Sequence, residues 1–361
     1  MRYQEFRLTL GAALVCVSLF GAQAAQAQSR SYCAVEIGSK GVKGRGFEFG
    51  VKGGDSSVRT NFSRDINTTI IASLKDGLLA STAMEETAEA VATLIQEMRA
   101  TTPDCKAFAV GSSGVALAKN KEALAEAVGR RIDVGALEFV TPEQEAEYGF
   151  ISSVPKRDWA STVLVDIGSS NTKIGYVSDG KFRAADLPFG SVSLSKKAAD
   201  GGADFAKALA VVMDTQVRPA FRDASARAPG MGNRKKVIWI GGAAWSTATF
   251  MRPDHSLRAF VRLDRTDVKR FMGGLNDRTW SNHKPSAKAS AKVQAAFDKD
   301  AARVLDIFTR DNLLSGVSLF DAFLNDRGVE GPVNFARQGQ WLMGYAAARF
   351  ADEVWSDEAL E

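Results

Sequence analysis

Ala34-Val35-Glu36-Ile37-Gly38-Ser39-Lys40-Gly41-Val42-Lys43 and Leu164-Val165-Asp166-Ile167-Gly168-Ser169-Ser170-Asn171-Thr172-Lys173 are two copies of one pattern, and this repeat decides the fold. Five of the ten aligned positions are identical. In each copy an apolar run ends in an acid, a turn of glycine and small polar residues follows, and a second strand is expected, over 45–51 in the first copy and 174–177 in the second. Each copy predicts a β-hairpin, and the repeat predicts two related domains.

The two turns have the composition of phosphate-binding loops. Glycine lets the backbone turn sharply, and exposed N–H groups and hydroxyls suit phosphate oxygens. The candidate phosphate-binding residues of the turns are Gly38, Ser39, Gly41, Gly168, Ser169, Ser170, Asn171 and Thr172. The acids at the strand ends, Glu36 and Asp166, can hold a metal ion or a water. We therefore expect two domains that face each other across a cleft for a phosphorylated ligand; the alternative is a duplication with a purely structural role.

Strands and helices alternate along the rest of the chain, which is typical of an α/β protein. We expect helices over 81–99, 302–324 and 337–355 and strands over 107–110, 137–140, 183–188 and 235–241. The strand 107–110 runs into another small-residue turn, which contains Ser112 and Ser113. Thr141 followed by Pro142 predicts a helix start, where Glu143, Gln144 and Glu145 are explained by capping alone. The repeat divides the chain into an amino-terminal domain over 28–158 and a carboxyl-terminal domain over 159–361.

The first 27 residues have the pattern of a secretory signal peptide. Arg2 and Arg7 precede an apolar run over 8–22, and small residues with an Ala-x-Ala pattern follow. A membrane anchor is the alternative, but the run is shorter than the roughly 20 apolar residues that a spanning helix needs. We expect cleavage near Ala25 or Ala27, a mature chain without a membrane span, and a periplasmic or secreted location.

Three cysteines are present, and Cys16 lies in the predicted signal peptide. Cys33 and Cys105 each begin a short apolar run, and an exported pair in an oxidising compartment can form a disulfide. If the two runs are neighbouring parallel strands, both sulfurs lie at the same edge of a sheet. The alternative is two unpaired buried thiols. A catalytic or metal role is disfavoured because no third soft ligand lies nearby in sequence.

Composition and charge exclude several classes of protein. The 361 residues are 45% hydrophobic and 24% charged, which is an ordinary globular composition. The net charge of +4 is nearly balanced, and the basic residues over 258–270 are interrupted by acids, so we expect no nucleic-acid binding. The chain has two histidines, His255 and His283, in polar stretches, which gives little support to histidine catalysis or a histidine metal site.

With these motifs the chain resembles the exopolyphosphatase and guanosine pentaphosphate phosphatase (Ppx/GppA) family over nearly all of its mature length. The family's Asp-Ile-Gly-Ser-Asn-Ser-x-Arg hairpin is similar to Glu36 through Lys43, and its Asp-Ile-Gly-Gly-Gly-Ser-Thr-Glu hairpin to Asp166 through Lys173. Its Thr-Ser-Ala-x-Arg-x-Ala-x-Asn segment resembles the stretch from Ser112 to Asn120, and its Ser-Gly-x-Glu-Glu-Ala-Arg segment the stretch from Thr141 to Glu147. The order and spacing of these segments agree as well.

The resemblance implies an actin-like (ribonuclease H-like) fold, with two duplicated domains of mixed β-sheets and flanking helices around a cleft. It implies a phosphoanhydride held between the hairpins with Mg²⁺, and a water activated by a glutamate that falls on Glu145. Glu36 and Asp166 would then help to place the metal, and Ser112 and Ser113 would bind phosphate. Such a carboxylate can orient and deprotonate water beside a phosphate.

Three departures from the family pattern lie at working positions. Lys173 stands where the second hairpin has a glutamate, Ala116 where the family has an arginine, and Glu36 where it has an aspartate. Lys40, Lys43 and Lys173 can bind phosphate as point charges. A cation beside the metal position weakens Mg²⁺ binding, because like charges repel.

Two functions follow from the sequence. The first is an exported phosphoanhydride hydrolase, with inorganic polyphosphate favoured over a phosphorylated guanosine nucleotide because alarmone nucleotides are made and used inside the cell. The second is a polyphosphate- or nucleotide-binding or sensing protein that kept the fold and lost efficient catalysis. An ATP-using kinase or chaperone is disfavoured, because the chain is short for an added substrate domain. The sequence leaves the oligomeric state open, a homodimer included.

Overall fold

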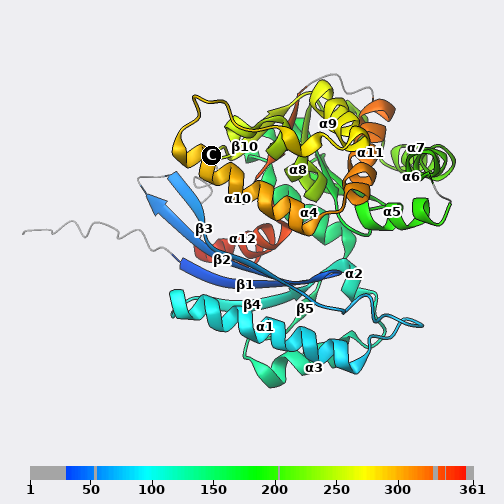
Figure 1. Cartoon of the computed structure of the whole chain (residues 1–361). Coiled ribbons are helices and arrows are strands. Elements are labelled where there is room, and N and C mark those ends of the chain that lie inside the picture. The colour runs from blue at the N-terminus through cyan, green and yellow to red at the C-terminus, as the bar shows by residue number, and fades with distance from the viewer. Residues whose placement is uncertain (1–29, 53–54, 202–203, 328–331, 338, 355–361) are drawn as a thin grey trace, which may run out of the picture.

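The computed structural model describes residues 30–52, 55–201, 204–327, 332–337 and 339–354, which form two mixed β-sheets with helices on their faces (Figure 1). The predicted signal peptide over 1–27, with Cys16, lies outside these residues. Among the helices described, none combines the length and the apolar character that crossing a bilayer requires.

The first sheet is built around the first copy of the repeat. Its strands are β1 (Arg30–Gly38), β2 (Gly41–Lys52), β3 (Asp55–Asn67), β4 (Lys106–Gly111) and β5 (Glu138–Phe139). Their order is β3-β2-β1-β4-β5, with β1, β2 and β3 antiparallel and β4 and β5 parallel to β1.

The second sheet repeats this topology around the second copy. Its strands are β6 (Thr162–Ile167), β7 (Thr172–Ser178), β8 (Lys181–Leu187), β9 (Lys236–Gly241), β10 (Phe260–Leu263) and β11 (Val333–Ala336). Read from β8, the order is β8-β7-β6-β9-β11, followed by the edge strand β10. This order, without β10, is the same as that of the first sheet in sequence position and in strand direction: β8-β7-β6-β9-β11 corresponds to β3-β2-β1-β4-β5. The repeat therefore extends beyond the hairpin to the whole sheet.

Twelve α-helices within the described residues cover the sheets. They are α1 (Ser81–Thr101), α2 (Ser113–Ala116), α3 (Lys121–Arg131), α4 (Pro142–Ser153), α5 (Ser191–Ala199), α6 (Phe205–Val212), α7 (Arg218–Arg227), α8 (Gly242–Met251), α9 (Arg265–Asp277), α10 (Ala291–Ile307), α11 (Arg310–Asp326) and α12 (Trp341–Val354). A π-helical turn over Met213–Val217 joins α6 to α7. Two clusters of buried apolar side chains lie on the outer faces of the two sheets. Helices α1 and α3 cover the first sheet there, and the helices from α5 to α11 cover the second.

Two helices each pack against the sheet of the other half of the chain. Helix α4 follows the first sheet in the chain but packs on the second, where Phe150 contacts the cluster of Leu164 and Ile238. Helix α12 follows the second sheet but covers the first, as its red ribbon in Figure 1 shows. The two helices cross at Gly344, where a Cβ atom would lie 1.8 Å from the carbonyl oxygen of Tyr148. Only glycine allows so close a crossing.

The disulfide expected from the compartment argument is present. Cys33 on β1 and Cys105, just before β4, are bonded with their Cα atoms 5.6 Å apart. As predicted, β1 and β4 are parallel neighbours, and Cys33 pairs in register with Ala107. The bond therefore fixes the start of β4 to the strand that carries the first turn.

Some sequence-based boundaries were wrong. The helix expected over 302–324 is two helices, α10 and α11, with a break at Phe308 and the capping residue Thr309. Thr309 begins a new helix because its hydroxyl accepts a hydrogen bond from the N–H of Asn312. The helix expected over 337–355 is α12, which begins at Trp341. The strand β3 was not predicted, because its sequence is polar and it lies at a sheet edge.

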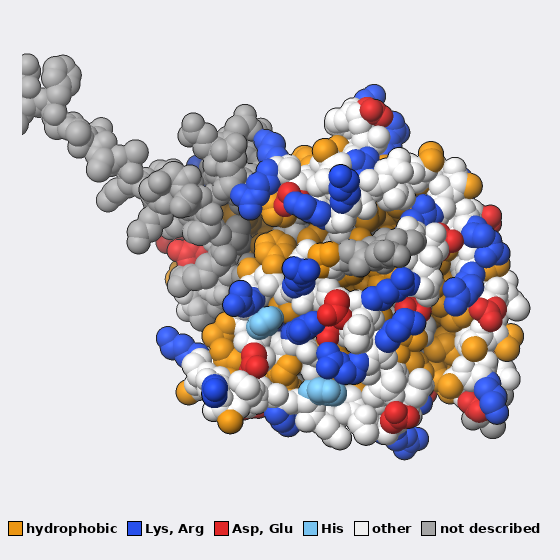
Figure 2. Space-filling view, turned by 90° about the horizontal axis from the view of Figure 1, so that it is seen from above, with side chains coloured by type: hydrophobic (Ala, Val, Ile, Leu, Met, Phe, Trp, Pro, Cys, Tyr) orange, Lys and Arg blue, Asp and Glu red, His pale blue; other side chains and the backbone are white. Residues whose placement is uncertain are grey.

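Charged side chains of both signs are interspersed on the face shown in Figure 2. Several ion pairs join elements of the second half; for example, Arg252 bonds to Asp264 and to the fully buried Asp267 at 2.9 and 2.6 Å. The stretch over 258–270, where acids interrupt the basic residues, contains the strand β10 and the start of α9.

Candidate functional site

The first turn, between β1 and β2, places an acid and a lysine side by side. Glu36 and Lys43 are direct cross-strand partners, and the Lys43 ammonium bonds to Oε1 of Glu36 at 2.7 Å. Gly41 closes the turn with φ +144°, and a Cβ atom there would lie 2.2 Å from the carbonyl oxygen of Ile66. A residue with a side chain is excluded from this position, so the glycine fixes the turn.

The second turn, between β6 and β7, repeats the acid–lysine pair. Asp166 and Lys173 are direct cross-strand partners, and Nζ of Lys173 lies 3.1 Å from Oδ2 of Asp166. The start of α5 holds this turn, because the N–H of Ser191 donates to the carbonyl of Gly168 at 2.9 Å. The hydrogen-bonding register therefore brings each acid of the repeat against a lysine.

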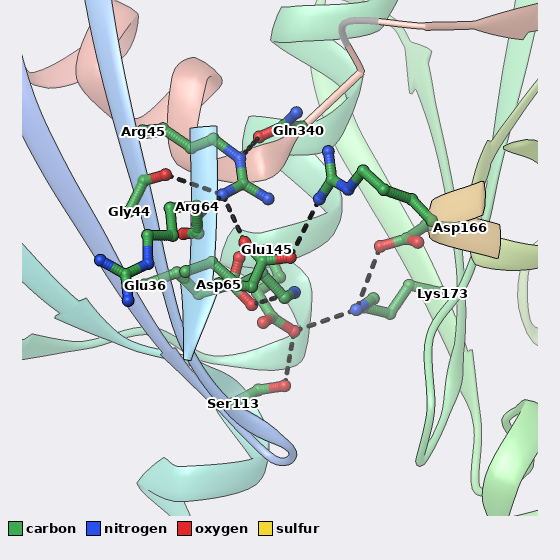
Figure 3. A network of polar contacts seen from close by, with 12 residues as sticks. Glu36, Gly44, Arg45, Arg64, Asp65, Ser113, Glu145, Asp166, Lys173 and Gln340 are labelled. Atoms are coloured by element: carbon green, nitrogen blue, oxygen red, sulfur yellow. Dashed lines mark hydrogen bonds and ion pairs between the residues drawn. The ribbon is translucent and has the colours of Figure 1, made fainter. Parts of the chain in front are cut away.

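Glu145 connects the second turn to the first domain. It lies in the first turns of α4, which begins as predicted with Thr141 as the cap and Gln144 completing the capping box. The Glu145 carboxylate is 3% exposed, and its Oε2 accepts from Oγ of Ser113 at 2.6 Å and from Nζ of Lys173 at 3.1 Å (Figure 3). Glu145 is thus a buried bridge between the turn after β4 and the hairpin of β6 and β7.

The turn after β4 packs against the first hairpin. The N–H of Ser112 donates to the carbonyl of Ile37 at 2.9 Å. A Cβ atom on Gly114 would lie 2.6 Å from the hydroxyl oxygen of Ser39. Ser112, Ser113 and Ser39, predicted from separate motifs, therefore belong to one region of the structure.

The ends of the two turns offer donors that suit an anion. Lys40 is exposed at the tip of the first turn, and its ammonium lies 5.8 Å from the ring centre of Phe308 in the other half of the chain. Partial burial and the charge of Lys43 lower the pKa of Lys40. An anion placed between these two lysines would relieve their mutual repulsion.

Backbone donors add to these lysines. Among the hydrogen bonds of the described residues, none uses the N–H of Ser39 or Lys40 in the first turn, or of Ser169 or Ser170 in the second. N–H groups that are left unpaired at a turn are suited to phosphate oxygens.

Thr172 and Lys173 lie differently from the other predicted phosphate ligands. The Thr172 hydroxyl is fully buried and donates to the carbonyl of Phe189 at 2.7 Å. Lys173 is 5% exposed and is held by the two carboxylates described above. Burial disfavours the charged form of Lys173, but Asp166 and Glu145 outweigh burial and raise its pKa above the ordinary value. We therefore keep these two residues out of the proposed phosphate-binding set.

A second charged cluster lies beside the turns and was not predicted from the sequence. Arg45 on β2 is 6% exposed; it donates to Oδ1 of Asp65 at 2.5 Å and to the side-chain oxygen of Gln340 at 3.0 Å. Arg303 of α10 bonds to the other carboxylate oxygen of Asp65 at 3.3 Å. Burial alone would raise the pKa of Asp65, but Arg45 lowers it below the ordinary value. Arg45 is two residues from Lys43, so alternation on β2 could have placed both on one face, whereas nothing in sequence marks Asp65 or Arg303.

The carboxylates that the resemblance assigns to Mg²⁺ do not fit a metal ion in this arrangement. Glu36 is bonded to Lys43, and the Lys173 ammonium lies between Asp166 and Glu145. In the described part of the chain, no three acid, histidine or cysteine side chains come together as metal ligands. Mg²⁺ needs oxygen ligands about 2.0–2.1 Å from the ion, and an ammonium already fills the space between these two carboxylates.

The arrangement of the two halves is the actin-like fold of the Ppx/GppA proteins. The Ppx/GppA family member from Aquifex aeolicus matches with a TM-score of 0.63 and 17% identity, over 91% of this chain and 100% of that chain. An exopolyphosphatase from Cytophaga hutchinsonii matches with a TM-score of 0.64 and 14% identity, over 91% and 100% of the two chains. In sequence, no family profile and no curated protein matches this chain. The likeness at these identities establishes the fold.

Proposed function

We propose that this chain is an exported phosphate-chain-binding protein with the Ppx/GppA fold, and that its ligand is inorganic polyphosphate. The observation that carries the proposal is the bridge that Glu145 makes between two predicted turns. Its carboxylate bonds to Ser113 in the turn after β4 and to Lys173 in the second hairpin. The turn after β4 also packs against the first hairpin, where the N–H of Ser112 donates to the carbonyl of Ile37. The amino-terminal sequence and the Cys33–Cys105 disulfide support export.

The ligand would bind at the ends of the turns. Lys40 and Lys43 supply positive charge, and the N–H groups of Ser39, Ser169 and Ser170 supply hydrogen bonds. A linear polyanion suits such a site because it presents many equivalent oxygens and needs no base-specific contact. A phosphorylated nucleotide presents the same phosphate chemistry, and export favours polyphosphate over it.

Hydrolysis of the phosphoanhydride is a second candidate function, and Glu145 favours it. The sequence resemblance assigns the role of base to Glu145, and its Oε2 accepts a hydrogen bond from the Ser113 hydroxyl at 2.6 Å. However, the same oxygen also accepts a hydrogen bond from the Lys173 ammonium, so it is already engaged with two donors of the chain and is not open to an attacking water. For this reason binding without efficient turnover is the function that the geometry supports better.

Binding and phosphate release by the mature chain separate these functions. In EDTA, we expect the wild type to bind polyphosphate with an affinity that falls as salt rises, because the contacts are ionic. Lys40→Ala combined with Lys43→Ala should weaken binding about tenfold or more, since one charged hydrogen bond is worth about 1.5–3 kcal/mol. The control is Lys181→Ala, an exposed lysine at the other end of the β7–β8 hairpin, which should bind as the wild type does.

Phosphate release is measured on the same samples with and without Mg²⁺. No release from the wild type is expected. Release that Glu145→Gln abolishes would establish the hydrolase instead, and the absence of polyphosphate binding in every condition would refute both functions.

A further inference from the structure

Lys173 occupies the position that a bridging cation would take between two buried carboxylates. Its Nζ lies 3.1 Å from Oδ2 of Asp166 on β6 and 3.1 Å from Oε2 of Glu145 on α4. All three side chains are at least nine-tenths buried. Figure 3 shows the ammonium between the two acids, at the end of an extended side chain from β7. Two acids from different elements thus share one positive charge.

We propose that the Lys173 ammonium is a built-in replacement for a divalent cation, so that this site is organised without a metal. The identity of the ligand bound beside it rests on the function proposed above, but the replacement itself concerns only the chain's own residues. A lysine in place of the acid of the resembled motif changes the local charge by +2, which equals the charge of one divalent ion. Three carboxylates with one divalent ion carry a net charge of −1, and two carboxylates with the Lys173 ammonium carry the same net charge, so the site reaches the same balance with a group that is covalently attached.

The other acids near the site do not restore a metal position. Glu36 is bonded to Lys43 at 2.7 Å, and Asp65 is held by Arg45 and Arg303. A divalent ion near Asp166 and Glu145 would approach the Lys173 ammonium within a few ångströms. Two positive charges so close in a buried environment repel strongly, so the metal and the lysine exclude each other.

A metal titration tests this inference without reference to activity. The probe is Mn²⁺, whose free concentration is followed by electron paramagnetic resonance, with the mature wild type, Lys173→Glu and Lys173→Gln. We expect no stoichiometric Mn²⁺ site in the wild type at millimolar metal. Lys173→Glu should gain one site per chain that Mg²⁺ competes for, and Lys173→Gln, which removes the ammonium without adding an acid, a weaker one.

A matched variant controls for net charge. Lys181→Glu makes the same change of −2 at the turn between β7 and β8, at the other end of the strand that carries Lys173, and should gain no site. Circular dichroism shows which variants are folded, and Lys173→Gln keeps the test decisive if Lys173→Glu does not fold. A stoichiometric Mn²⁺ site in the wild type, or no gain in either folded Lys173 variant, would overturn the inference.

The polyphosphate measurement in EDTA is independent of this result. Wild-type binding that needs added Mg²⁺ would contradict the replacement while leaving the proposed ligand intact. Absence of polyphosphate binding, combined with a metal site gained by Lys173→Glu, would refute the proposed function and leave the replacement standing.

Discussion

The Lys43 side chain in the first hairpin is 44% exposed, whereas the Lys173 side chain in the second is 6% exposed, although each faces an acid in the same register of its hairpin. The difference comes from α4, whose Glu145 bonds to the lysine of the second pair, whereas in the described part of the chain no second acid forms an ion pair with Lys43. One repeated pattern thus gives a first pair whose lysine is open to solvent and can be reached by a ligand, and a sealed second pair, Asp166 and Lys173, that joins two elements. Equivalent residues of a repeat therefore have different uses once a single neighbour differs.

The largest expected effect on stability comes from the disulfide that joins β1 of the first hairpin to the start of β4. Replacing Cys33 and Cys105 by alanine should lower the free energy of unfolding by about 4 kcal/mol, since the bond closes a loop between residues 72 positions apart. Urea unfolding of the oxidised proteins measures the loss. Reduction should lower the wild-type midpoint towards that of the variant and leave the variant unchanged; a loss below about 1 kcal/mol would contradict this account.

The next largest effect on stability is expected for the sealed pair of Asp166 and Lys173. Lys173→Met removes the shared ammonium and leaves two buried carboxylates without it, which should cost about 3 kcal/mol of folding free energy. Urea unfolding at neutral pH measures this loss, and a variant as stable as the wild type would show that the triad contributes nothing.

The pH dependence of that loss has a definite sign. Because the pKa of Lys173 is raised in the folded chain, its contribution is fully present below the ordinary value of 10.5 and is lost as pH rises through the folded value. The difference between wild type and Lys173→Met should therefore be constant from neutral pH to about pH 10 and narrow above it.

The smallest effect on stability is expected for Lys43. Lys43→Met should cost about 1 kcal/mol, less than Lys173→Met, because the Lys43 side chain is 44% exposed and only one buried carboxylate, that of Glu36, loses its partner. The same unfolding experiment measures it beside Lys173→Met. A loss as large as that of Lys173→Met would remove the contrast between the two hairpins.

The sequence was informative where the chain's own periodicity sets the structure. The hairpins, the helix start at Thr141 and the strand at β9 depend on local patterns and were predicted. The pairing of Glu145 with Lys173 depends on α4 packing across the halves onto the second sheet, and no local pattern specifies that. Likewise, Asp65 reaches Arg45 only through the register of the polar strand β3 with β2.

The return of α12 to the first sheet has a consequence for how the chain folds. Tyr32, Phe47 and Phe108 form one face of that sheet, and Trp341 and Tyr345 complete the cluster from the far end of the described chain. A nascent amino-terminal half therefore exposes an aromatic surface until α12 has emerged. Such a high contact order slows folding and leaves that surface open to aggregation or to a chaperone. If the proposed export is correct and the chain crosses the membrane unfolded, this dependence on a late helix delays compaction of the first half until α12 has crossed.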